Sequence, residues 1–92
     1  MPRYVIEREI PGAGQLSPVE LRTISKQSVG ILKELGQSIT WLHSFVTDDK
    51  IYCIYDSPNV ELIHEHARCM GIPANHVAEV RVMIDPTTAI DV

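Results

Sequence analysis

Metal-ligating side chains are the groups in this chain that could do chemistry: four histidines, two cysteines and twelve acidic residues. Imidazole and carboxylate groups bind divalent transition metals at neutral pH. The densest run is His64-Glu65-His66. Residues two apart on a helix lie about 200° apart around its axis, so these imidazoles cannot hold one ion from a single helix. We therefore predict His64 and His66 as ligands of separate sites, or of a site shared with a second chain, with Glu61 and Glu65 as carboxylate partners.

Two further candidates lie on strand-like segments. His43 alternates with Trp41 and Phe45, which predicts that the three share one strand face and makes His43 a second metal locus. Cys53 and Cys69 lack the CxxC spacing of soft-metal carriers. Transfer through paired thiolates is therefore not expected, and Cys53 is interpreted as a small core residue.

Catalytic and phosphate-binding signatures are missing from the sequence. It contains no nucleophile elbow, P-loop or dinucleotide fingerprint. The run Gly12-Ala13-Gly14 could hold an anion on free amides, although a connection of this length needs glycine for its bends alone. These observations favour a non-catalytic protein.

The helices that must position these residues are marked by characteristic residues at their starts and ends. Ser17-Pro18 and Ser57-Pro58 each begin a stretch of helical period that a glycine ends, because serine caps the first turn and glycine adopts the left-handed conformation that stops a helix. Glu20 completes a capping box with Ser17. The pattern predicts helices over residues 18–35 and 58–70, and strands over residues 3–10, 39–46, 50–55 and 77–84.

The order βαββαβ predicts an α+β, ferredoxin-like fold for residues 1–92 as a single domain. Right-handed crossovers place both helices on one face of a four-stranded antiparallel sheet, which leaves the other face open. We expect the last strand to bury Ala78, Val80, Val82 and Ile84. The open face is expected to present Val5, Glu7, Glu9, Trp41, His43, Phe45, Glu79, Arg81 and Met83.

Strand register and assembly are less determined by the sequence. If Val46 pairs with Ile51, His43 lies across from Ile54, whereas a loop one residue longer places His43 across from Tyr55. A mixed apolar and charged open face exposes more apolar area than a monomer tolerates, so we predict a homodimer.

Composition excludes several classes of protein. A formal charge of −4 with scattered Lys and Arg argues against nucleic acid. The chain is 45% hydrophobic and 22% charged, which is typical of a globular domain. The N-terminus alternates polar and apolar residues, so we expect no signal peptide, no membrane span and a cytoplasmic protein.

Several segments together resemble a known family. They are EREIPGAG, LSPVEL, ITWLHSFV, DDKIYCIYDSP, HEHA, GIPA and IDPTTA. In combination they are similar to a small bacterial ferredoxin-like family of unknown function, one member of which is known as a dimeric protein that holds nickel at its surface. The resemblance implies a dimer and makes nickel the first metal to test, but it assigns no ligand residue.

A second interpretation is an enzyme or a small-molecule binder. Its pocket would lie between the open sheet face and a partner subunit, lined by Glu7, Trp41, His43 and Cys53. Dimeric α+β barrels of this topology provide the analogy.

Overall fold

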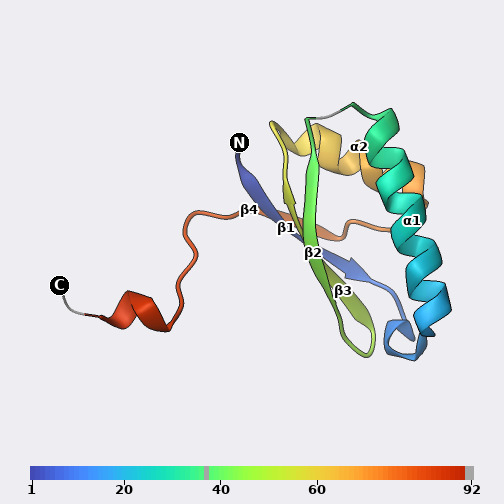
Figure 1. The fold of residues 1–92 in the computed structure, drawn as a ribbon, viewed down its shortest axis with the longest axis horizontal. Coiled ribbons are helices and arrows are strands. Elements are labelled where there is room, and N and C mark those ends of the chain that lie inside the picture. The colour runs from blue at the N-terminus through green and yellow to red at the C-terminus, as the bar shows by residue number, and fades with distance from the viewer. Residues whose placement is uncertain (37, 91–92) are drawn as a thin grey trace.

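The structure is a computed structural model that describes residues 1–36 and 38–90. It contains a four-stranded antiparallel sheet in the order β2-β3-β1-β4, with two α-helices against one face, which is the α+β ferredoxin-like arrangement (Figure 1). The elements in chain order are β1 (Arg3–Glu9), the 3-10 helix η1 (Ala13–Gln15), α1 (Pro18–Glu34), β2 (Thr40–Val46), β3 (Lys50–Asp56), α2 (Val60–Met70), β4 (His76–Glu79) and the 3-10 helix η2 (Pro86–Ala89).

The helix ends lie at the predicted capping residues with one exception. The Ser17 side chain caps α1 and Glu20 returns the bond, so the predicted capping box is present. Helix α2 begins at Val60 rather than Pro58, because Asn59 is its N-cap and accepts from the Leu62 amide at 3.0 Å. Ser57 is fully buried and holds the preceding turn instead, with its hydroxyl donating to the Asn59 carbonyl at 2.7 Å.

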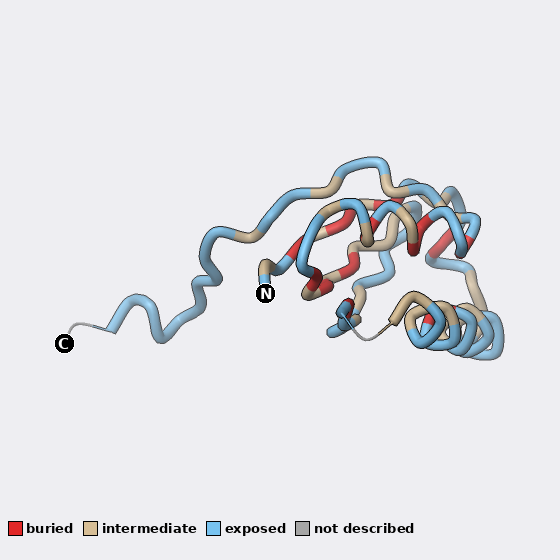
Figure 2. Tube along the Cα trace, turned by 90° about the horizontal axis from the view of Figure 1, so that it is seen from above, coloured by how far each residue is buried: buried red, intermediate tan, exposed pale blue. Residues whose placement is uncertain are grey.

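The core lies between the sheet and the helices. Buried side chains come from the helix-facing side of β1 and β3 and from one stripe of α2, whereas most of the chain beyond β4 is exposed (Figure 2). The central members are Tyr4, Ile6, Ile39, Cys53, Tyr55 and Ile63. Cys53 is therefore the core residue that the sequence predicted.

The β2–β3 pairing settles the register and corrects one placement. Val46 pairs with Ile51 and His43 with Ile54, which is the first of the two predicted registers. A bulge at Leu42 then shifts the pairing, so that Trp41 lies opposite Tyr55. An extra residue reverses the alternation of a strand. Trp41 therefore faces the helices, and the prediction that it shares the open face with His43 and Phe45 is wrong.

The last strand also differs from its prediction. Strand β4 ends at Glu79, and its pairs Ile6–Val77 and Tyr4–Glu79 turn Val77 and Glu79 toward the helix side. Ala78 pairs with Val5 and faces the open side. The predicted burial of Ala78, Val80, Val82 and Ile84 is thus wrong, as is the open-face placement of Glu79, Arg81 and Met83. Residues 81–90 are all exposed and leave the body of the domain as an extended arm (Figure 1).

Candidate functional site

Strand β1 sends a charged side chain into the core. Tyr4, Ile6 and Arg8 alternate on its helix-facing side, and all three are buried. Arg8 is only 1% exposed. A guanidinium does not lose its proton in a protein, so this is a buried positive charge.

Two hydrogen bonds hold the Arg8 guanidinium. Its Nε donates to the Cys53 sulfur at 3.4 Å, and Nη1 donates to the Pro73 carbonyl at 2.9 Å. Nη2 is buried, and among the described residues nothing accepts a hydrogen bond from it. The Arg8 side chain borders a partly open cavity of about 80 Å³ between the sheet and the helices.

His66 of α2 enters the same interior. Its imidazole is 1% exposed, and Nε2 lies 3.1 Å from the Ser28 hydroxyl of α1. Burial, the Arg8 charge and a smaller opposing effect of Ser28 together lower the pKa of His66 to about 4. His66 is therefore neutral at pH 7, and its ring lies 5.3 Å from that of Tyr55.

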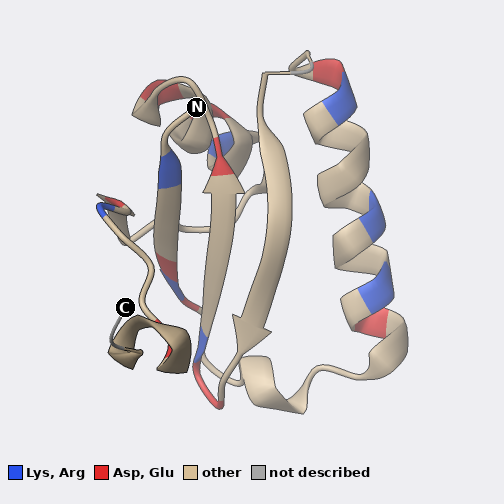
Figure 3. Ribbon diagram, turned by 60° about the vertical axis from the view of Figure 1, so that its left-hand side comes forward, with Lys and Arg blue, Asp and Glu red and all other residues tan. Residues whose placement is uncertain are grey.

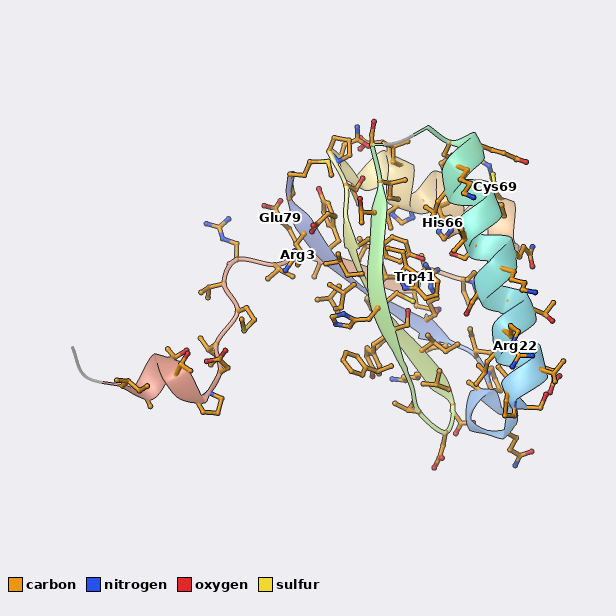
Figure 4. The ribbon with its side chains drawn as sticks, viewed as in Figure 1. Arg3, Arg22, Trp41, His66, Cys69 and Glu79 are labelled. Carbon is orange, nitrogen blue, oxygen red and sulfur yellow. The ribbon has the colours of Figure 1, made fainter. Side chains whose placement is uncertain are left out.

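The cavity is lined by apolar and hydroxyl-bearing side chains from the sheet and from α1. Trp41 reaches into this space from β2, and its indole nitrogen donates to the Ser44 hydroxyl at 2.9 Å (Figure 4). Burial raises the pKa of Tyr55 against the smaller opposing effects of Ser28 and Arg8. The full lining is Arg8, Leu21, Ile24, Ser25, Ser28, Trp41, Ser44, Val46, Ile51, Cys53, Tyr55, His66, Met70 and Ile72.

The open sheet face carries a different set of groups. Glu7 lies at its centre, with His76 Nε2 at 3.7 Å from one carboxylate oxygen and Lys50 Nζ at 3.6 Å from the other. His43 and Phe45 lie on the same face, with ring centroids 5.2 Å apart. Strand β2 has no charged residue, and β3 has charges only at its ends (Figure 3).

The predicted metal ligands of α2 are not brought together. His64 is exposed and His66 is buried, as expected for residues on different sides of one helix. Glu61 is exposed, while Glu65 pairs with Arg68 and contacts the exposed thiol of Cys69. Within residues 1–36 and 38–90, no three His, Cys, Asp or Glu side chains gather around a common point.

The predicted small-molecule pocket is divided by the sheet. Glu7 and His43 lie on the open face, whereas Trp41 and Cys53 lie on the helix face. These four residues therefore cannot line one pocket.

The glycine loop before α1 serves a structural contact. Gly12 donates to the Asp49 carboxylate and Gly14 to the Asp48 carbonyl, both at 2.9 Å. These amides hold the β2–β3 turn and are not free for an anion.

Arg8 was not among the candidate residues predicted from the sequence. The available signal was its alternation with Tyr4 and Ile6, which places Arg8 on the buried side of the strand. Ser28 and His66, which line the same cavity as Arg8, come from two different helices, and no local pattern joins the three residues.

Comparisons with known proteins add the following findings. A family model described as nickel responsive protein SCO4226-like matches residues 4–80. The crystal structure of SCO4226 from Streptomyces coelicolor A3(2) superposes with a TM-score of 0.74 at 14% identity, covering 89% of this chain and 99% of that one. A comparison with curated proteins finds no match. In the part of the chain that the structure describes, no helix is long and apolar enough to cross a membrane.

Proposed function

Because the chain belongs to the SCO4226-like family of nickel responsive proteins, we propose that it is a small, cytoplasmic, non-catalytic homodimer that binds nickel. The observation that carries the proposal is the pair formed by Glu7 and His76 on the open sheet face. There an imidazole nitrogen and a carboxylate oxygen lie 3.7 Å apart, and the His76 side chain is 76% exposed. Nitrogen and oxygen donors of this kind suit Ni²⁺.

In this proposal, Glu7 and His76 of one chain supply half of the nickel site. One chain offers two donors, and a two-fold axis over the open face would bring the same two from a second copy. Four nitrogen and oxygen donors match a tetragonal nickel geometry. His43, on the same face, is a further donor within the dimer. His64, Glu61 and Glu65 of α2 remain a separate predicted locus, whereas His66 would first have to leave its buried contact with Ser28.

The apolar groups of the open face support the dimer. Phe45 is 57% exposed there, and Val5, Tyr52 and Ile54 are half-buried beside it. A second copy would remove this surface from water.

Calorimetric titration of tag-free protein with Ni²⁺ tests the metal site. We expect one nickel ion per two chains, and at least tenfold weaker binding in His76→Ala and in Glu7→Gln, because each change removes one of the paired donors. His64→Ala is the matched control, since it removes an exposed imidazole from another part of the surface and should bind as the unmodified protein does. Unchanged binding in both site variants, or loss only in His64→Ala, would move nickel away from the sheet face.

A further inference from the structure

The buried charge of Arg8 has no negative partner in the described residues. The ion pairs between side chains join Arg3 to Asp56, Lys50 and His76 to Glu7, and Arg68 to Glu65, and none includes Arg8. Burying a charge without a partner is costly, and arginine cannot lower that cost by deprotonation. A bound anion at Nη2 would supply both the missing acceptor and the missing charge.

The cavity next to Arg8 has the composition of a binding site for an amphiphilic anion. Its lining contains no Asp, Glu or Lys, so no side chain there would repel an anion or compete with Arg8 for it. Trp41, Leu21 and Ile24 supply apolar walls of the same cavity. These three side chains remain half-buried, so the cavity reaches solvent beside α1.

The size of the cavity limits the ligand. One water molecule takes up roughly 10–15 Å³ of cavity volume, so a cavity of about 80 Å³ accommodates a molecule of roughly five to eight heavy atoms. The small side chains of Ser25 and Ser28 on the inner side of α1 leave this space. A single guanidinium arm balances one negative charge.

We propose that the cavity between the sheet and α1 binds a short-chain monocarboxylate, whose carboxylate accepts from Arg8 Nη2 and whose apolar body packs against Trp41, Leu21 and Ile24. The neutral imidazole of His66 and the hydroxyls of Ser28 and Tyr55 border the carboxylate end. This site lies on the opposite side of the sheet from Glu7 and His76, so it is independent of the proposed nickel site.

Butyrate is the probe, because it has six heavy atoms and one charge. The sole tryptophan, Trp41, reports binding by fluorescence, and calorimetry with EDTA present excludes a metal-mediated effect. We expect saturable binding of one butyrate per chain, and at least tenfold weaker binding of butyramide, which has the same shape without the charge. Phosphate is the second anion and should compete poorly, because it lacks an apolar body.

Three variants locate the site. Arg8→Met should weaken butyrate at least tenfold by removing the cation, and Ser25→Leu should do so by filling the cavity while keeping Arg8. Arg22→Met is the matched control, because Arg22 lies on the exposed side of α1 and its loss should not change binding (Figure 4). If Arg8→Met fails to fold, Ser25→Leu and the butyramide comparison still decide. Absence of butyrate binding, equal binding of butyramide or phosphate, or unchanged affinity in Ser25→Leu would overturn the proposal.

Discussion

At the scale of single residues, the interior is organised by one cation and one neutral imidazole. Arg8 and His66 come from opposite walls of the core, and both are 1% exposed. Burial first, and then repulsion by the Arg8 guanidinium, lower the pKa of His66 and keep the imidazole unprotonated. The Ser28 hydroxyl then bonds a neutral ring. This arrangement ties the stability of the fold to pH.

The depressed pKa of His66 predicts acid destabilisation in a defined window. The pKa is about 4 in the folded protein against 6.5 in the unfolded chain. Below pH 6.5 the imidazole of the unfolded chain takes up a proton, whereas the buried imidazole of the folded chain stays neutral. The contribution of His66 to the free energy of unfolding is therefore fully present above pH 6.5 and is lost as the pH falls toward 4. The whole difference corresponds to about 3 kcal/mol of unfolding free energy, of which about 2 kcal/mol is lost between pH 7.5 and pH 5. Urea unfolding at pH 7.5 and pH 5 measures it.

A matched pair of variants isolates this effect. In His66→Gln the side chain bonds Ser28 without titrating, so the fall in stability between the two pH values should shrink. His64→Gln removes an exposed histidine and should leave the fall unchanged. An equal pH dependence in His66→Gln and the unmodified protein would contradict the assignment.

At the scale of elements, the sequence predicts helices and strands whose periodic pattern is unbroken. It fails where one extra residue reverses the alternation of side chains along a strand. The helices and the fold class follow from periodicity and capping chemistry. The sequence left two registers open for β2 and β3, and only the structure selects the one that pairs Val46 with Ile51. The bulge at Leu42 could not be predicted, because nothing local distinguishes TWLHSFV from a continuous strand. The alternation of residues 77–84 suggested a long strand, but β4 has neighbouring backbone to pair with only as far as β1 extends.

The candidate site was predicted less well than the fold. Glu7 and His43 were placed correctly on the open face, whereas Trp41 was assigned to the wrong face by the unseen bulge. Arg8 and Ser28 line the same cavity only after the helices and the sheet have packed. Their shared location is a property of the tertiary structure that spacing along the chain does not encode.

Substitution of alanine for glycine should have opposite effects on stability at two positions. A Cβ at Gly14 would lie 2.9 Å from the Asp48 Cα, because η1 packs directly on the β2–β3 turn. Gly14→Ala should therefore cost about 1–3 kcal/mol. Gly30 lies within α1 with open space around its Cβ position, so Gly30→Ala should stabilise by about 1 kcal/mol. Urea unfolding of both proteins checks the signs, and a Gly14→Ala protein as stable as its parent would contradict the close packing.

At the scale of the whole molecule, the C-terminal arm makes this chain more extended than a compact domain of the same length. A compact chain of 92 residues has a radius of gyration of about 12 Å, whereas this one measures 14.4 Å. The arm accounts for the extension, with Val82, Met83 and Ile84 at 69–75% exposure (Figure 2). It points away from its own sheet, so in this conformation it does not cover its own open face (Figure 1). We infer that it packs on the second copy of the proposed dimer.

Removal of the arm tests that inference. A chain ending at Val80 keeps all four strands and both α-helices but loses the exposed apolar residues of the arm. The full chain should have twice the 10.3 kDa monomer mass by light scattering, and the shortened chain should have the monomer mass, because its contact area falls. The full-length variant Val82→Ser/Met83→Ser/Ile84→Ser should behave like the truncation if apolar burial holds the arm. A shortened chain that remains dimeric would place the contact on the sheet face alone, and a monomeric full chain would remove the dimer altogether. In a monomer the two halves of the proposed nickel site never meet, so loss of the arm should also weaken Ni²⁺ binding. Butyrate binding in the cavity between the sheet and α1 should stay intact.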